Sequence, residues 1–194
     1  MMLMGLDPGL ASFGLALVEV PAQGLPRVRM LEIFRTEKAA KKRNLRQADD
    51  LSDRSRQIWR WLDGTCEVYR PAIIAVESCA LPFGKARFSV VSALGRVRGL
   101  VDALAGHRSA AILELTPQEM KQYTAGNKSA TKDEVRLALE KLYPEACAQW
   151  PRQKTLVEHA ADALGAAHCA LQSDFVRALR HATEDPVSDL PARL

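Results

Sequence analysis

Apolar and polar positions follow one another in blocks along the chain, and these blocks predict an ordered series of strands and helices. Five short runs, apolar or alternating and bounded by Pro, Gly or charged residues, are typical of strands; they cover residues 2–6, 13–20, 28–34, 72–76 and 110–115. Between and after the later runs, apolar residues recur every three or four positions, as on one face of a helix. The order predicts an α/β fold with a mixed five-stranded sheet flanked by helices, its first three strands antiparallel.

Three segments have the form of a helix-opening capping box, in which a Thr is followed three positions later by a Glu. They are residues 116–119, 131–134 and 155–158. The third predicts the start of the last helix, which we expect to end before Pro186. We therefore expect a single domain over residues 1–184 and a loose tail over residues 185–194.

The composition is that of an ordinary globular protein. The 194 residues suffice for one sizeable core, and the net charge of +4 permits an anionic partner without requiring one. The four cysteines form no C-x-x-C pair, so neither a zinc cluster nor a disulfide framework is indicated. No apolar run reaches the roughly 18 residues of a membrane-spanning helix. We expect a cytoplasmic protein that does not bind membranes.

Two acids stand at the ends of predicted buried strands. Asp7 follows the first strand and opens a Pro-Gly turn, and Glu77 follows the fourth strand. The turn alone accounts for Asp7 as well as a functional site does. If the two strands are neighbours, however, their carboxylates meet and require a cation between them. Hard oxygen ligands of this kind suit Mg²⁺ or Mn²⁺.

The last predicted helix carries a second candidate pair, His159 and Asp162. Their spacing of three places both on one helix face. We interpret Glu158 as structural, because the capping box already explains it. His159 would lie in the first helical turn, where the helix dipole should lower its pKa and keep the ring neutral. A neutral imidazole can bind a metal or accept a proton.

Gly95 and Gly99 lie four positions apart in the helix predicted over residues 85–105. Small residues at this spacing allow another backbone to approach closely. Two interpretations stay open, packing on the chain's own sheet and contact with a second subunit.

Three segments resemble motifs of the RuvC family of Holliday-junction resolvases. They are residues 5–14 (GLDPGLASFG), residues 76–78 (VES) and residues 159–164 (HAADAL), in the family's order over residues 1–172. The resemblance implies a ribonuclease H-like fold, a homodimer and divalent-metal cleavage of branched DNA. It matches Asp7, Glu77, His159 and Asp162 to the family's catalytic metal-binding quartet, which implies two Mg²⁺ per active site, with Mn²⁺ able to substitute.

The resemblance also implies DNA contacts. Lys121 and Lys132 fall where the family places basic residues near the scissile backbone, and Lys128 is a further base in the same loop. The family usually has an aromatic residue three positions after its Glu, where this chain has Ala80. We expect Phe83 to replace it through a loop shift, with Lys85 as a further DNA contact.

The resulting hypothesis is a structure-selective endonuclease that resolves Holliday junctions by paired, metal-dependent cleavage in DNA recombination and repair. Its partners would be four-way junction DNA and a second copy of the chain, with room for a branch-migration motor. Two alternatives are a phage-type branched-DNA endonuclease with relaxed sequence specificity and an inactive ribonuclease H-like DNA-binding module. A phosphate loop of the actin and sugar-kinase type is a third, disfavoured because those ATPases need two such domains.

Overall fold

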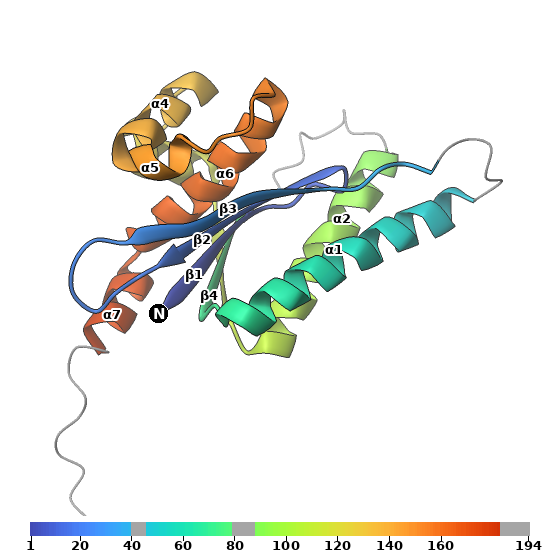
Figure 1. Ribbon diagram of the computed structural model, residues 1–194, viewed down its shortest axis with the longest axis horizontal. Helices are drawn as coiled ribbons and strands as arrows, with labels where there is room; N and C mark the ends of the chain where they lie inside the picture. The colour runs from blue at the N-terminus through green and yellow to red at the C-terminus, as the bar shows by residue number, and fades with distance from the viewer. Residues whose placement is uncertain (40–45, 79–87, 183–194) are drawn as a thin grey trace, which may run out of the picture.

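The computed structural model describes residues 1–39, 46–78 and 88–182, and in these ranges the chain forms one sheet with helices on both faces (Figure 1). The strands are β1 (Met2–Asp7), β2 (Ser12–Glu19), β3 (Arg27–Arg35), β4 (Ile73–Glu77) and β5 (Ala111–Leu115). The helices are α1 (Gln47–Tyr69), α2 (Phe88–Arg108), α3 (Pro117–Ala125), α4 (Lys132–Leu142), α5 (Pro144–Cys147), α6 (Lys154–Leu171) and α7 (Asp174–Ala182).

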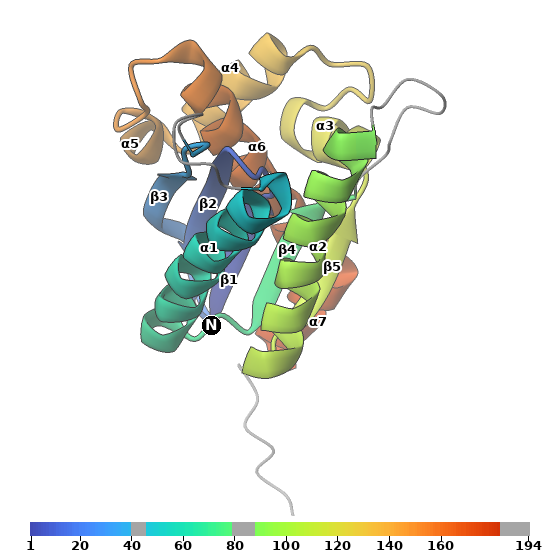
Figure 2. The same ribbon diagram turned by 90° about the vertical axis from the view of Figure 1, so that its right-hand side faces the viewer.

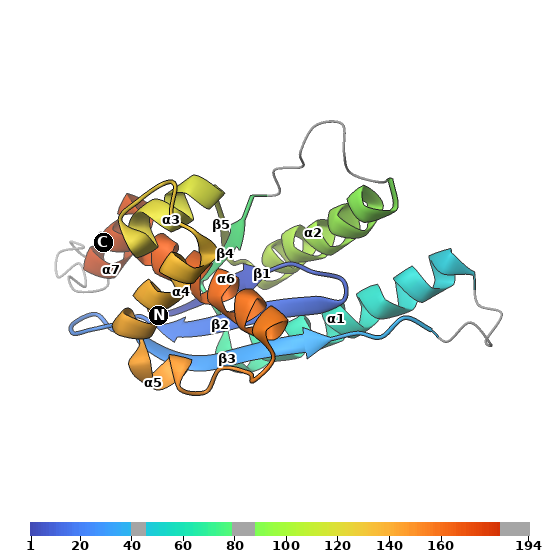
Figure 3. The same cartoon turned by 90° about the horizontal axis from the view of Figure 1, so that it is seen from above.

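The strand order across the sheet is β3-β2-β1-β4-β5. The pairs β1–β2 and β2–β3 are antiparallel, whereas β1–β4 and β4–β5 are parallel. Figure 3 shows β2 and β3 side by side, with β4 and β5 beyond β1. The predicted mixed sheet with three antiparallel first strands is confirmed.

Each face of the sheet is covered by its own helices. Helices α1 and α2 lie side by side on one face (Figure 2), and α6 crosses the other, with α3 and α4 packed against it. Because successive side chains of a strand point to opposite faces, β1 serves both layers. Met4 and Leu6 join the α1/α2 layer, and Leu3 joins the α6 layer.

Helix α6 approaches the sheet closely at two glycines. A Cβ on Gly5 would collide with the carbonyl oxygen of Ala163 and lie 2.7 Å from the backbone nitrogen of Ala167. A Cβ on Gly14 would collide with the carbonyl oxygen of His159. Glycine inside a strand therefore marks, at both places, the close approach of another backbone.

Two of the three predicted capping boxes form, and the third does not. The hydroxyls of Thr116 and Thr131 each accept a hydrogen bond from the backbone N–H of the Glu three positions later. The carboxylate of that Glu in turn accepts from the backbone N–H of the Thr. Helix α6 starts earlier than expected, at Lys154 with Gln153 as its N-cap, so Thr155 lies inside the first turn. The backbone N–H groups of residues 156 and 157 both donate to the Gln153 carbonyl. That carbonyl begins the helix without a side-chain cap.

The end of the chain also differs from the expected single last helix. Helix α6 ends at Leu171, and α7 follows after a short break, opened by the hydroxyl of Ser173, which accepts from the backbone N–H of Val176. The short helix α5 was not predicted. The expected tail over residues 185–194 lies outside the described residues. No helix in the described part of the chain is both long and apolar enough to cross a membrane.

The turn between β2 and β3 lies at the far end of the sheet from Asp7, since Asp7 pairs with Gly14 near the start of β2. Gly24 has φ +96° in this turn, and Leu25 is 82% exposed. Arg180 of α7 donates to the carbonyl oxygens of Ala22 and Gly24.

The close approach of α6 predicts a large difference between two Gly→Ala substitutions. Gly5→Ala should lower the free energy of unfolding by about 1–3 kcal/mol, because the new methyl group meets backbone atoms that cannot move aside alone. Gly64→Ala, in α1 with no atom within 4 Å of the added Cβ, should raise it by about 1 kcal/mol through helix propensity. Urea denaturation of both variants measures these changes. If both variants changed the free energy of unfolding equally, the packing of α6 on the sheet would not require a glycine at position 5.

Candidate active site

The two strand-end acids lie on neighbouring parallel strands. Leu6 pairs with Val76 in the register of β1 and β4, so Asp7 and Glu77 follow at the same edge of the sheet. Together with Ser78 and Pro117 they line a small cavity of about 210 Å³. Both side chains are half-buried rather than free in solvent.

Helix α6 brings His159 and Asp162 to the same edge. His159 Nδ1 donates to Asp7 Oδ2 at 2.5 Å, and the two side chains are 34% and 19% exposed. The close backbone contact at Gly14 places this turn of α6 directly over the sheet. The structure thus brings together four residues that are up to 155 positions apart in the sequence, from Asp7 to Asp162.

A lysine from α4 completes the group. Lys132 Nζ donates to Glu158 Oε2 at 3.1 Å and lies 3.6 Å from Asp162 Oδ2. The interpretation of Glu158 as a helix-start residue is therefore wrong, because its carboxylate binds Lys132 instead of capping α6. The sequence signal for Glu158 was its spacing of four from Asp162, which puts both acids on one helix face.

The carboxylates at this edge repel one another. Burial raises the pKa of Glu77 to about 7, with further increases from the charges of Asp162 and Asp7. Burial and the charge of Asp7 likewise raise the pKa of Asp162 to about 6. Lys132 and Lys121 act in the opposite direction on Glu77. These shifts are those of several acids that share one poorly solvated site.

The expectation of a lowered pKa for His159 is wrong for this structure. The hydrogen bond to Asp7 raises the pKa of the ring, and this effect outweighs the opposing effect of burial. Because α6 starts at Lys154, His159 lies beyond the first turn, where the helix dipole has largely faded. Asp7 therefore controls the charge of this histidine.

The donor set suits a divalent cation. Three carboxylates and one imidazole are hard or borderline ligands of the kind that Mg²⁺ and Mn²⁺ take, and their mutual repulsion would be relieved by positive charge. Within residues 1–39, 46–78 and 88–182, no three His, Cys, Asp or Glu side chains are already arranged around one ion position. His159 and Lys132 instead hold Asp7 and Asp162. Metal ligation would therefore require these side chains to re-orient.

Of the remaining predicted DNA contacts, two lie within the described residues and two lie outside them. Lys121 is half-buried in α3 near Glu77, and Lys128 is exposed in the loop between α3 and α4. Phe83 and Lys85 lie outside the described residues, as does Ala80. Sequence reasoning missed Arg98 of α2, which lines the cavity of Asp7 and Glu77 and is held by Asp102 and Glu114.

The fold and this edge of the sheet define the class, a ribonuclease H-like domain, and solved structures agree. The structure of Thermus thermophilus RuvC matches with a TM-score of 0.66 and 26% identity, covering 87% of this chain and 92% of that one. The structure of T. thermophilus RuvC in complex with Holliday junction substrate matches in fold, with a TM-score of 0.65 and 23% identity over the same shares of the two chains.

Sequence comparison identifies the family. The chain is 30% identical over 169 residues to the crossover junction endodeoxyribonuclease RuvC of Moorella thermoacetica, covering 87% of this chain and 90% of that protein. The family model described as crossover junction endodeoxyribonuclease RuvC matches residues 3–170. The chain belongs to the RuvC family.

The raised acid pKa values predict how stability depends on pH without metal. Between about pH 4.5 and 7 the folded protein keeps a proton on Glu77 that the unfolded chain has released, so the free energy of unfolding should fall as the pH rises through this window. Asp162 adds a change of the same sign from about pH 4 to 6. Glu77→Gln should flatten the decrease and be more stable than wild type at pH 7.5.

Urea denaturation in EDTA across this pH range measures the difference between variant and wild type. Glu145→Gln, which changes an exposed acid of α5, is the control and should leave the slope unchanged. If the free energy of unfolding of Glu77→Gln followed the same pH dependence as that of wild type, the raised pKa of Glu77 would be contradicted.

Proposed function

We propose that this chain resolves Holliday junctions by metal-dependent hydrolysis of phosphodiester bonds, at the site formed by Asp7, Glu77, His159 and Asp162. The observation that carries the proposal is the convergence of acids from two adjacent strand ends and α6 at one edge of the sheet, in a chain of the RuvC family. The biological setting is DNA recombination and repair in the cytoplasm, with a branch-migration motor as a further partner.

The four residues would hold two Mg²⁺ ions, and Mn²⁺ would substitute. Such ions polarise the scissile phosphate, lower the pKa of a water and stabilise the leaving oxygen. Before any ion binds, His159 holds Asp7 at the site through the hydrogen bond from Nδ1. Burial, together with the charges of neighbouring acids, raises the pKa values of Glu77 and Asp162, so these two groups would gain most from an added positive charge.

The lysines around this edge would bind the DNA backbone. Lys132 already faces Asp162 and Glu158, so its ammonium group is placed to neutralise charge that develops on the phosphate. Lys121 of α3 lies near Glu77, and Lys128 lies on the exposed loop that joins α3 to α4. Phosphate contacts of this kind supply affinity without reading sequence. Phe83 remains a proposed contact at the junction centre, and Lys85 remains a further proposed DNA contact.

Symmetrical resolution of a four-way junction needs two cuts and hence two active sites, which we propose a homodimer supplies. The face of α2 that bears Gly95 and Gly99 is our choice for the contact. Both glycines are exposed, and an added Cβ on either meets no atom within 4 Å. The chain's own sheet therefore does not use them.

The dimer proposal predicts that Gly95→Glu/Gly99→Glu is a monomer at micromolar concentration, since like charges would face each other across the two-fold axis. The variant should nick junctions without coordinated double cutting. Analytical ultracentrifugation measures the state, and Gly64→Glu, equally open but in α1, should stay dimeric. A wild-type monomer at this concentration would rule the interface out.

The proposed function predicts that Asp7→Asn abolishes cleavage and leaves junction binding largely intact. Loss of a direct ligand should exceed the roughly 100-fold effect typical of an outer partner of a ligand, whereas lysine–phosphate contacts persist. The assay compares four-way, three-way and linear DNA with Mg²⁺ and with EDTA. Wild type should cut the four-way junction only with metal.

The matched control is Asp174→Asn, an exposed acid at the start of α7, which should cut at the wild-type rate. Cutting that continues in EDTA, or loss of junction binding in Asp7→Asn, would count against the assignment of the site.

A further inference from the structure

A groove between α4 and α6 opens beside the candidate active site, and the proposed chemistry does not use most of it. It has a volume of about 520 Å³. We call it the α4–α6 groove, and the residues that matter below are Lys132, Arg136, Arg152, Lys154, Val157 and Asp162. Since Lys132 and Asp162 also belong to the candidate active site, the groove is continuous with it.

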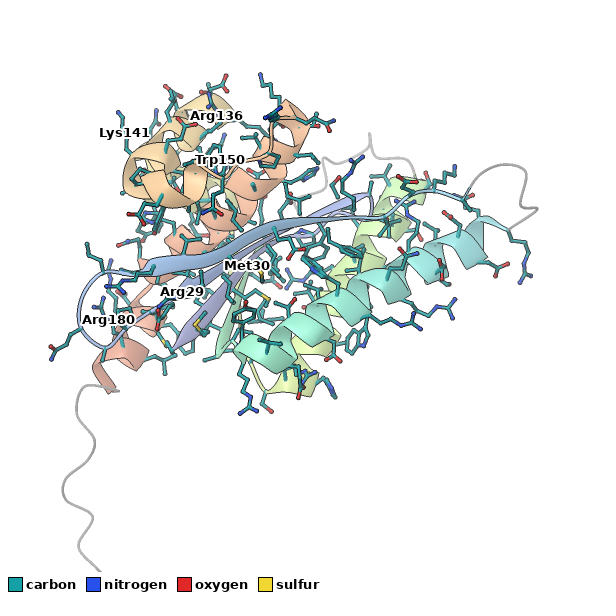
Figure 4. The ribbon with its side chains drawn as sticks, viewed as in Figure 1. Arg29, Met30, Arg136, Lys141, Trp150 and Arg180 are labelled. Atoms are coloured by element: carbon teal, nitrogen blue, oxygen red, sulfur yellow. The ribbon has the colours of Figure 1, made fainter. Side chains whose placement is uncertain are left out.

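At the inner end of the groove, by which we mean the end beside the candidate active site, the charged side chains form ion pairs with one another. Glu158 and Asp162 face Lys132 at 3.1 and 3.6 Å. Arg136 of α4, labelled in Figure 4, binds Glu140 at 2.7 Å and lies 3.7 Å from Asp133. These side chains already have partners, so this end offers little unbalanced charge.

The outer end is different. Arg152 and Lys154 are exposed, and neither side chain makes a hydrogen bond or ion pair with any other residue that the structure describes. Between them and Lys132 the groove surface includes Val157 and the buried residues Val135 and Ala161. Free cations beside an apolar strip match a sugar–phosphate backbone, which presents phosphate charge and an apolar sugar edge in alternation.

We propose that the α4–α6 groove holds the backbone of the cleaved strand on one side of the scissile phosphate, with Arg152 and Lys154 contacting its phosphates. This inference rests on the proposed function, because it takes the scissile phosphate to lie at Asp7, Glu77 and Asp162. Arg152 and Lys154 are positioning residues. They hold the flanking backbone so that the reacting phosphate is oriented.

The charge balance of the groove favours a tethered strand over a free small anion. Four cationic and three anionic side chains line it, so a free anion meets carboxylates almost as often as cations. A strand already held at the scissile phosphate is different, since its neighbouring phosphates are delivered at high effective concentration.

Binding of a four-way junction tests the proposal, in an Asp7→Asn background so that the DNA stays intact. Arg152→Ala/Lys154→Ala should weaken binding by up to about 60-fold at 0.1 M salt and reduce the slope of log K against log salt by about 1.8, the value for two duplex phosphates. The matched control is Lys141→Ala, which removes an exposed cation in the last turn of α4 (Figure 4) that does not line the groove and has no ion-pair partner among the described residues. It should change neither quantity.

Methylphosphonate substitution of single phosphates locates the contact. Neutral linkages one to three positions from the scissile phosphate, on one side, should weaken wild-type binding and have no further effect in the double variant. In cleavage by the protein with Asp7 intact, the double variant should raise KM more than it lowers kcat. Thermal unfolding should stay at the wild-type temperature, because neither side chain has a hydrogen-bond or ion-pair partner in the described part of the chain.

Two results would overturn the inference in distinguishable ways. If wild type cuts junctions but the double variant keeps the wild-type Kd, salt slope and KM, the groove is not a backbone site, and the proposed function stands. If wild type cuts no junction with any divalent metal, both the function and the groove assignment fall.

Discussion

The arrangement of the site depends on direct contact between the backbone of α6 and the sheet at Gly5 and Gly14. No side chain separates the helix from β1 and β2 at these points, so helix and strands act as one rigid unit. The face of α6 that touches them is made largely of alanine, including Ala163 and Ala167. Because these backbone contacts set the distance between α6 and the sheet, His159 is held within hydrogen-bond distance of Asp7 without help from a flexible loop.

Much of this architecture follows from local patterns in the sequence. The strands were recognisable as bounded apolar runs, and the adjacency of β1 and β4 brings Asp7 and Glu77 to one edge as their strand-end positions suggest. The spacing of His159 and Asp162 places them on one helix face. The glycine signal was also present, since Gly5 and Gly14 interrupt otherwise apolar strands.

What the sequence could not provide are features that depend on tertiary contacts. Residues 155–158 match the sequence pattern of a capping box, yet the helix begins earlier, because the carbonyl of Gln153 accepts its first backbone hydrogen bonds. Glu158 is consequently free to bind Lys132, a contact that requires α4 to pack beside α6. The pKa of His159 depends on a tertiary contact for a related reason. The position of His159 in its own helix predicts a lowered pKa, but the hydrogen bond to Asp7 of β1 raises it.

Two basic side chains already contact the acids that divalent ions would share. Lys132 lies against Asp162, and His159 against Asp7. Burial is the main cause of the raised pKa values of Glu77 and Asp162, and these contacts offset part of the repulsion that adds to it. These contacts hold the acids together in the fold, and at the proposed metal site ion binding would exchange internal partners for external ones.

The turn between β2 and β3 is separated from all of this by the length of the sheet. Its Leu25 side chain is 82% exposed, and Arg180 of α7 donates hydrogen bonds to two backbone carbonyl oxygens of the turn. A fluorophore or a surface tether attached at position 25 would stand away from the edge that carries Asp7 and Glu77. The molecule thus has a natural handle for single-molecule observation, with its acidic edge left facing free solution.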